Sequence, residues 1–261
     1  CPVIGTDQQP DGSWIVRTEK GDIHAQWVVN AAGLWGREVA ALAGLTLPLQ
    51  PTEHQYFVTE TIDEIEKLGR RLPSIADRDG EYYFRQEGNG LLIGAYEKDM
   101  KFWAEDSTPL DFAHDLFPDD LDRIMENVIR ATERVPVAAS AGVKRVINGP
   151  MIWSPDSNML WGPVPELKNY FMMGGLIPGF SQSGGLGLLA AQWMIEGEPQ
   201  YDMFAWDLAR FGDWADKKFT KARVRDSYVH RFKIHFPNEE RSAGRPARVR
   251  PAFEMQKNMG A

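Results

Sequence analysis

The sequence predicts a mixed fold that joins an α/β layer to a second part of α+β character. A strand, a connection of small residues and a helix follow one another over 27–43 and again over 170–197, which predicts the layer. Between these segments, over 48–165, the chain changes to β-rich segments with one clear helix, which indicates a second domain or a large insertion. With 261 residues the chain can form one large domain or two small ones.

The N-terminal part begins with a predicted β-meander. Apolar and polar residues alternate over 14–18 and 23–29, and glycine turns bound these runs. They lead into a buried strand at 27–30. The small residues at 31–33 suit a tight turn, and the apolar spacing over 34–43 indicates a helix. This order of elements is typical of an α/β layer.

The β-rich part has three predicted strands, at 55–59, 82–85 and 91–96. The clearest helix of the chain follows them. Asp119 or Asp120 can cap it, and it ends before Pro136. The apolar stripe that we expect on one side of this helix consists of Leu121, Ile124, Met125, Val128 and Ile129.

Strand character returns at 170–173 and is followed by glycines. An irregular segment then leads to a predicted helix over 183–195, which Gly197 closes. The remainder, 201–261, is aromatic at first and then polar and rich in Arg. We expect it to be a docking extension or the start of another domain.

Composition excludes several classes of protein. Apolar residues make up 43% and charged residues 25%, which is typical of a globular chain and not of a disordered or fibrous one. No apolar run reaches the ~18 residues that cross a bilayer, so we expect a soluble protein. A net charge of −8 argues against a nucleic-acid surface, and the basic stretch 241–250 is expected to be a solvated tail.

The cysteine content indicates the compartment of the protein, and the first residue indicates whether the chain is a piece of a longer one. Cys1 is the only cysteine, so no internal disulfide is expected, and a reducing compartment fits. We expect the cytoplasm, or the mitochondrial matrix in a eukaryote. Because the chain opens without Met and without a targeting segment, we expect it to be a piece of a longer polypeptide.

Two motif-like strings are better explained by packing and capping. The letters of a dinucleotide fingerprint occur at 185–190, but they stand about seven residues beyond the preceding strand, where small residues more often permit close packing. The segment 179–183 nearly matches a hydrolase nucleophile elbow, but its fifth residue is Ser. Ser181 or Ser183 serves more simply as a helix N-cap.

The histidines do not predict a metal site, because none has metal-ligand spacing. They are His24, His54, His114, His230 and His235. His54 differs from the others because it lies in Glu53-His54-Gln55-Tyr56, at the start of a strand that leads into the β-rich part. A structural role and a substrate contact both remain open for it.

The strand 82–85 carries a second candidate group. Alternation along a strand places Tyr83 and Arg85 on one face, and Tyr82 and Phe84 on the other, so one pair should be buried. A hydroxyl and a guanidinium on one face could bind a carboxylate. Aromatic strand residues are also common in cores, so both explanations stand.

The segment from Gly174 to Ser181 is unusual for a loop. It holds three glycines and a proline and carries no charge, whereas loops are usually polar and lie on the surface. Its apolar residues, Leu176, Ile177 and Phe180, predict that a flat apolar group covers it while its backbone remains free for hydrogen bonds.

A set of short motifs runs through nearly the whole chain in a fixed order. The motifs are Val28-Val29-Asn30-Ala31-Ala32-Gly33-Leu34-Trp35, Glu53-His54-Gln55-Tyr56, Tyr83-Phe84-Arg85-Gln86-Glu87, Leu92-Ile93-Gly94, Gly149-Pro150, Ser154-Pro155-Asp156, Gly162-Pro163-Val164-Pro165 and the glycine-rich 174–187. This set resembles the flavin-dependent amine oxidoreductases of the dimethylglycine and sarcosine dehydrogenase type, which are related to D-amino-acid oxidase. The part after Gly197 resembles the family's central domain.

The resemblance implies FAD as cofactor and assigns residues to it. The cofactor-binding residues would be Ala31, Ala32, Gly33, Trp35, Gly174, Gly175, Leu176, Ile177, Pro178, Gly179, Phe180 and Ser181. The catalytic or substrate-facing residues would be His54, Tyr83 and Arg85, with the tyrosine uncertain by one position because Tyr82 is adjacent. The implied division is a first FAD-binding segment at 1–47, an antiparallel-sheet substrate domain at 48–165, a returning FAD-binding segment at 166–200 and a central-domain extension at 201–261.

The chain departs from the family in what it lacks. The family's N-terminal strand, its G-x-G-x-x-G turn with the acidic ribose-binding residue and its folate-binding unit are all absent from these residues. We therefore expect a partial flavin-binding layer without its pyrophosphate cradle. The implied partners are the missing N-terminal half or another subunit, and tetrahydrofolate through an absent C-terminal domain.

The implied activity is oxidation of dimethylglycine or sarcosine by hydride transfer from the N-methyl carbon to FAD. An iminium ion would result, for capture by water or by a folate-bearing domain. His54 or its water would take the amine proton, and Tyr83 and Arg85 would orient the substrate carboxylate. The alternative is a truncated or non-catalytic subunit that keeps the fold and a protein interface without binding flavin. Colour separates the two, because an active flavoprotein is yellow.

Overall fold

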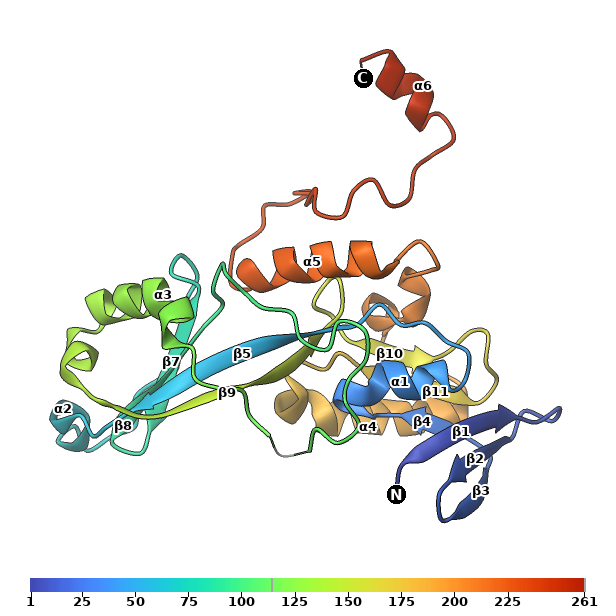
Figure 1. Cartoon of the computed structure of the whole chain (residues 1–261), viewed down its shortest axis with the longest axis horizontal. Helices are drawn as coiled ribbons and strands as arrows, with labels where there is room; N and C mark the ends of the chain where they lie inside the picture. The colour runs from blue at the N-terminus through green and yellow to red at the C-terminus, as the bar shows by residue number, and fades with distance from the viewer. Residues whose placement is uncertain (114, 261) are drawn as a thin grey trace.

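Three β-sheets form the framework of residues 1–113 and 115–260, which the computed structural model describes (Figure 1). The first sheet is an antiparallel meander of β1 (Val3–Gln8), β2 (Trp14–Thr18) and β3 (Gly21–Ala25). The second has the order β10-β11-β4, from β4 (Val28–Asn30), β10 (Leu160–Pro163) and β11 (Tyr170–Gly174). The third has the order β6-β7-β8-β5-β9, from β5 (Gln50–Thr59), β6 (Ile75–Asp77), β7 (Tyr82–Glu87), β8 (Gly90–Ala95) and β9 (Val143–Trp153).

The second sheet forms the predicted α/β layer. Strands β4 and β11 are parallel neighbours, with Tyr170 opposite Val28 and Met172 opposite Asn30. Each strand leads into helical structure: β4 into η1 (Gly33–Trp35) and α1 (Gly36–Ala41), and β11 into α4 (Gly179–Glu196). Because both strands point the same way, the segments that follow them leave the sheet at the same edge.

Asn30 fixes the turn that follows β4. Its side-chain amide donates to the carbonyl oxygen of Gly36 at 2.9 Å and to the hydroxyl of Tyr170 at 3.2 Å. The residue is 1% exposed, so these hydrogen bonds satisfy a buried amide. The small-residue turn is thus tied both to the helix after it and to the neighbouring strand.

The third sheet is antiparallel throughout, as expected for the β-rich part. Helix α3 (Leu121–Arg134) covers one of its faces, and the core between them contains Phe57, Tyr82, Phe84 and Ile124. The short helices α2 (Asp63–Glu66) and η2 (Pro136–Ser140) lie at the same end of the molecule (Figure 1).

Helix α3 has its buried face rotated from the predicted stripe. Ile124 is fully buried, but Met125 is 41% exposed and Ile129 is 52% exposed. Asn127 takes a core-facing place instead, because its amide donates to the carbonyl oxygen of Gly80 at 2.8 Å. A hydrogen-bonded polar residue therefore replaces two apolar residues on the contact face, which apolar periodicity alone did not predict.

Helix α4 begins four residues earlier than predicted, at Gly179. The last residues of the segment 174–181 therefore form its first turn. The helix places the string 185–190 well inside its own length, so that string does not form a phosphate loop at a strand end. Pro178 stands at the N-cap without a side-chain cap, and the Ser181 hydroxyl donates back to the Pro178 carbonyl oxygen at 2.9 Å, so neither predicted serine cap is present.

The C-terminal part lays one long helix over the body of the molecule. After η3 (Phe204–Trp206) and η4 (Leu208–Arg210), α5 (Lys217–Val229) lies beside β5 and β9, and the chain then extends away to α6 (Phe253–Asn258) (Figure 1). Val224 and Tyr228 of α5 are fully buried. Among the helices of the described ranges, none combines the length and the apolar character needed to span a bilayer.

Candidate functional site

The candidate site is centred on His54 in β5, which lies between β8 and β9 in the third sheet. Both ring nitrogens have hydroxyl partners: Nδ1 lies 3.0 Å from the Tyr228 hydroxyl and Nε2 lies 3.1 Å from the Tyr83 hydroxyl. The side chain faces away from α3, because the next residue, Gln55, bonds to the backbone of Asp120 at the start of that helix. Helix α5 covers the face that His54 occupies.

Tyr83 reaches His54 because a glycine lies between them. The strand order β7-β8-β5 places Tyr83 opposite Gly94, and Gly94 opposite Tyr56, two residues beyond His54. A Cβ atom on Gly94 would lie 2.3 Å from the Tyr83 hydroxyl oxygen. Only a residue without a side chain lets the Tyr83 ring lie across β8.

Aromatic rings enclose the imidazole. The Tyr96 ring stacks on His54 with the ring centres 4.7 Å apart, and Tyr228 meets it edge-on at 5.9 Å. Trp153 and Phe232 pack against Tyr96 in turn. Burial, helped by the positive charge of Arg123, lowers the pKa of His54 to about 4, so the imidazole is neutral near pH 7.

A buried group of charges lies behind the imidazole. Tyr228 donates its hydroxyl to Glu97 Oε2 at 3.0 Å, and Glu97 is 1% exposed. Arg123 of α3 lies 3.0 Å from the other oxygen of Glu97 and donates to Glu53 at 2.7 Å. Burial raises the pKa of Glu97 despite the nearby guanidinium, which makes this carboxylate readier than usual to hold a proton.

The structure separates the two adjacent tyrosines. Tyr83 faces His54, whereas Tyr82 lies on the opposite face with Phe84 and donates to Asp77 at 2.9 Å. The prediction that one pair of this strand would be buried is confirmed, because Tyr82 and Phe84 are 1% and 4% exposed. Arg85 is exposed and pairs with Glu87 at 3.1 Å. His54 and Tyr83 thus come together, and Arg85 stands apart from them.

Several residues of the site carry no local sequence signal. Glu97, Arg123 and Tyr228 were not singled out, and Gly94 appeared only as part of the motif Leu92-Ile93-Gly94, without a role. Arg231 was not singled out either; its guanidinium lies 5.7 Å from the Trp153 ring centre, and its charge partly offsets the burial that raises the pKa of Tyr96. The other histidines lie elsewhere: His24 is exposed, and His230 and His235 lie beside Asp226 and Glu239. His114 falls outside the described residues.

The predicted cofactor segments lie together at one edge of the second sheet. Residues 31–33 follow β4 and residues 175–178 follow β11, and these strands are parallel neighbours. Gly33 and Gly175 have φ angles of +56° and +66°, which glycine adopts most readily. The side chain of Trp35, another expected cofactor-binding residue, is directed toward Pro109 instead, because its ring nitrogen donates to the Pro109 carbonyl oxygen at 2.9 Å.

These segments fit the ring system of a flavin. Gly33, Gly179, Gly184 and Gly185 have open space where a side chain would start, and Phe180 is fully exposed. Gln182 Oε1 is buried without a hydrogen-bond partner. The first turn of α4 offers the positive end of its helix dipole, which suits the ring edge where negative charge develops on reduction. Within the described ranges, no G-x-G-x-x-G turn joins a strand directly to a helix as a pyrophosphate site requires.

The cofactor segment and the His54 site are in packing contact. Ile177 packs against the cluster that contains Tyr96, Trp153 and Tyr228. Leu176, its neighbour, packs on the other side against the core beneath α4. One loop therefore connects the edge that would hold a flavin ring to the aromatic enclosure of His54.

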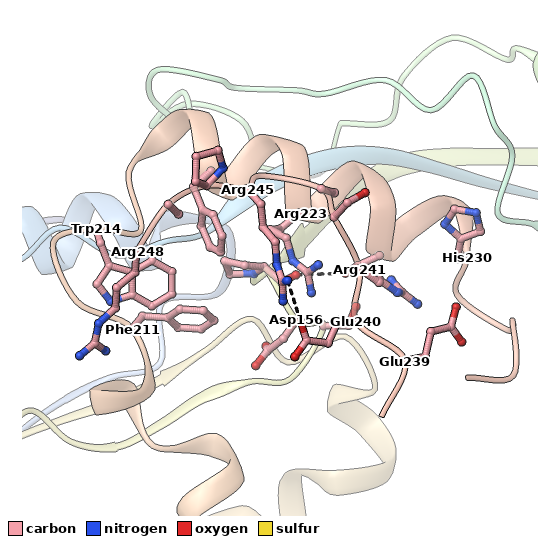
Figure 2. A pocket seen from close by; sticks show the side chains of 18 of the residues that line it. Asp156, Phe211, Trp214, Arg223, His230, Glu239, Glu240, Arg241, Arg245 and Arg248 are labelled. Carbon is pink, nitrogen blue, oxygen red and sulfur yellow. Dashed lines mark hydrogen bonds and ion pairs between the residues drawn. The ribbon is translucent and has the colours of Figure 1, made fainter. Parts of the chain in front are cut away.

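A separate cavity of about 1250 Å³ lies between α5 and the extended C-terminal segment (Figure 2). Arg223, Arg241 and Arg245 line it with Phe211 and Trp214, as the close-up shows. Two of its guanidinium groups have acidic partners. Asp226 accepts from Arg241 at 3.1 Å and Glu240 pairs with Arg245 at 2.6 Å.

The predicted solvated tail 241–250 is therefore only partly free. Arg245, Arg248 and Arg250 are exposed, as expected. Arg241 is half-buried, because it folds back onto the carboxylate of Asp226 in α5. An ion pair to the preceding helix, which net charge alone does not predict, holds the start of this stretch against the body.

Comparison with known proteins gives two family matches. Residues 1–193 match the model described as FAD dependent oxidoreductase, and residues 196–249 match the model described as FAD dependent oxidoreductase central domain. Mitochondrial dimethylglycine dehydrogenase of Rattus norvegicus is 42% identical over 251 residues, which are 94% of this chain and 29% of that protein. Mitochondrial sarcosine dehydrogenase of Mus musculus is 36% identical over 262 residues, which are 97% of this chain and 28% of that protein.

A solved structure supports the fold. L-proline dehydrogenase from P. horikoshii superposes with a TM-score of 0.65 at 24% identity, covering 80% of this chain and 53% of that one. The chain thus spans less than a third of the length of the two relatives and about half of the structural neighbour.

Proposed function

Because the chain belongs to the FAD dependent oxidoreductase family, we propose that it forms part of an enzyme that oxidises N-methylated glycines, dimethylglycine or sarcosine. The two relatives named above are dehydrogenases for these compounds by name, and FAD is the cofactor of the family. The observation that carries the proposal is the contact between the cofactor segment, through Ile177, and the enclosure of His54. A redox group held at 31–33 and 174–181 would lie beside a proton acceptor.

The chemistry divides between cofactor and protein. FAD, when bound, supplies an acceptor for the hydride that leaves the N-methyl carbon. The protein must free the amine lone pair, because a protonated amine has no electron pair from which the C=N bond of the iminium can form. Tyr83 and His54 would accept that proton, since they are joined at 3.1 Å and the imidazole is neutral. Water or a folate-bearing partner would then capture the iminium.

A guanidinium would hold the substrate carboxylate. Arg85 is the residue that the sequence motif indicates, and it would have to leave its surface pair with Glu87. Arg231 is the alternative, because it already lies over Trp153 beside the Tyr96 ring. Replacing each with Lys, which keeps the charge but loses the bidentate geometry, should raise KM for the substrate at the residue that binds it.

The rest of the assembly is also a proposal. We assign 1–47 and 166–200 to the flavin-binding layer, 48–165 to the substrate domain and 201–261 to the central-domain extension. Within 48–165, β10 pairs with β11 and so joins the sheet of the layer. The remaining flavin-binding half, with the pyrophosphate cradle, would come from another part of a longer chain or from a second subunit. The cytoplasm, or the mitochondrial matrix in a eukaryote, is the compartment that fits a reduced Cys1 and the two mitochondrial relatives.

Anaerobic flavin reduction tests this function. The flavin-loaded complete protein, which includes the remaining flavin-binding half, is mixed with dimethylglycine, sarcosine or trimethylglycine, and loss of the oxidised flavin absorbance is followed. The first two should bleach the flavin, and trimethylglycine should not, because its quaternary nitrogen has no lone pair. His54→Gln should slow reduction by about 10² to 10⁴ with flavin content unchanged. A yellow protein that no N-methylated glycine reduces would contradict the proposal, and a colourless protein would favour the subunit that binds no flavin.

A further inference from the structure

Four side chains on separate parts of the chain form one continuous line of hydrogen bonds. It runs from Tyr83 in β7 to His54 in β5, then to Tyr228 in α5 and to Glu97 just after β8. The successive distances are 3.1 Å, 3.0 Å and 3.0 Å. The first member is half-buried and the other three are 8% exposed or less. The line therefore leads from the candidate site into the interior.

The chemistry of the last member fixes the direction of every bond. An ionised carboxylate only accepts, so Tyr228 must donate its single proton to Glu97. The Tyr228 oxygen then accepts from His54 Nδ1–H, which leaves Nε2 as the acceptor for the Tyr83 hydroxyl. The imidazole is held in the Nδ1–H tautomer with its lone pair toward the candidate site.

The inner end of the line has room for one more proton. Glu97 and Glu53 share a single guanidinium, that of Arg123, whose side chain is 3% exposed, so the three groups together carry one negative charge. Asp120 also approaches Arg123, but Lys101 balances it at 2.6 Å. Glu97 Oε1 lies 3.0 Å from Arg123 Nε without the alignment of a hydrogen bond, so one of its lone pairs is free.

We propose that this line is a proton relay, which takes the proton released by the substrate amine at Tyr83 and delivers it to Glu97. The proposal rests on the function proposed above. As the substrate N–H bond breaks, Tyr83 gains that proton and passes its own to His54 Nε2. His54 passes its Nδ1 proton to Tyr228, and Tyr228 passes its proton to Glu97. One N–H bond is lost, one carboxylic O–H bond is formed, and neither the imidazole nor a phenol ends charged.

A relay explains how so buried a histidine can serve as acceptor. A free-standing imidazole in this enclosure resists a positive charge, because burial and Arg123 both oppose it. Passing a proton through the ring avoids that charge. Tyr228 lies within the segment 196–249 that matches the central-domain model, so that segment would supply a positioning and proton-transfer residue to the site of the first unit.

Two substitutions test the relay in the flavin-loaded complete protein. Glu97→Gln still accepts the Tyr228 hydroxyl through its amide oxygen but cannot take up a proton. Tyr228→Phe removes the hydroxyl and keeps the packed ring. Tyr82→Phe is the matched control, because it removes a buried hydroxyl bonded to a carboxylate on the opposite face of the same strand.

The pH profile of flavin reduction gives the first result. Both relay variants should be slowed about tenfold or more at a pH where the substrate amine arrives protonated, and they should approach wild type at a pH where it arrives as the free base. The control should match wild type throughout. Infrared difference spectra give a readout independent of turnover rate: reduction by substrate should produce the carbonyl band of a protonated carboxylic acid in wild type and not in Glu97→Gln.

The possible failures are distinguishable. If wild type is reduced by an N-methylated glycine, and Glu97→Gln keeps both its pH profile and its carboxylic-acid band, the relay is wrong and the proposed function stands. If no N-methylated glycine reduces wild type, the proposed function fails. The nitrogen chemical shifts of His54 then still report the tautomer, and an Nε2–H form would overturn the assigned direction. If Tyr228→Phe does not fold, Glu97→Gln decides the matter alone.

Discussion

Lowering the pH from 8 to 5 should weaken the folded state through His54. The ordinary pKa of 6.5 falls to about 4 in the fold, so the unfolded chain takes up a proton at a pH where the folded chain does not. The stability that the neutral imidazole contributes is complete above pH 6.5 and is lost as the pH falls toward 4. At 1.36 kcal/mol per pKa unit, the loss is about 2 kcal/mol at pH 5 and about 3 kcal/mol below pH 4.

Groups around His54 decide how the measurement is made. Tyr83, Tyr96 and Tyr228 face it as neutral phenols, and Arg123 adds a positive charge that opposes its protonation. Glu97 has a raised pKa, so it binds a proton more readily in the fold and gains stability as the pH falls. Its contribution has the opposite sign to that of His54, and the wild-type slope mixes the two.

The assay is urea unfolding of wild type and His54→Gln at pH 8, 7, 6 and 5. The difference between their free energies of unfolding should shrink by about 2 kcal/mol from pH 8 to pH 5, because only wild type carries the His54 titration. His24→Gln, at an exposed histidine, is the matched control and should retain the wild-type slope. A wild-type minus His54→Gln difference that stays constant from pH 8 to pH 5 would refute the reasoning, since it would mean that the imidazole titrates alike in both states.

Three further outcomes follow from the site and its surroundings. Gly94→Ala should move the Tyr83 ring off His54, because the new methyl group would lie 2.3 Å from the hydroxyl oxygen; we expect a cost of about 1–3 kcal/mol in unfolding and slower flavin reduction. Arg123→Met should cost about 3–5 kcal/mol by leaving the buried carboxylate of Glu97 and the partly buried carboxylate of Glu53 unpaired, whereas Arg130→Met, at an exposed pair with Glu126, should cost less than about 1 kcal/mol; equal losses in urea unfolding would contradict this. The chain by itself should lose FAD on gel filtration, because the described residues offer no pyrophosphate cradle, and stoichiometric co-elution would overturn that expectation.

Local sequence patterns predicted the layers of the fold, but they did not predict every strand or the first residue of every helix. The turn at 31–33 and the strand at 170–173 have near-neighbour signals, and both were placed correctly as parts of an α/β layer. Strand β9 was not predicted, because Gly149-Pro150 interrupts its pattern; pairing with β5 over its whole length, a long-range contact, holds it extended. Helix α4 begins at Gly179, directly after Pro178 at its N-cap, and so includes a glycine and a serine whose low helix propensity did not predict it.

The candidate site was predictable only in part for the same reason. Family motifs indicated His54 and Tyr83, but their contact depends on the strand order and on the bare backbone of Gly94. Glu97 and Tyr228 are 131 residues apart, and neither stands in a pattern that distinguishes it from an ordinary acid or a core aromatic. Hydrogen-bond partners of that kind are set by packing, which a single sequence does not contain.

The boundary between the two family matches, at residues 193–196, does not separate two independently packed parts of the structure. Val224 and Tyr228 come from the second match and are fully buried against rings of the first. Exchanging 196–249 for the corresponding segment of a relative would therefore remove the hydroxyl partner of His54 and Glu97, unless the new segment placed a hydroxyl at the position of Tyr228. In chimeras, residues 1–193 and 196–249 should therefore be exchangeable only together, as a matched pair from one protein.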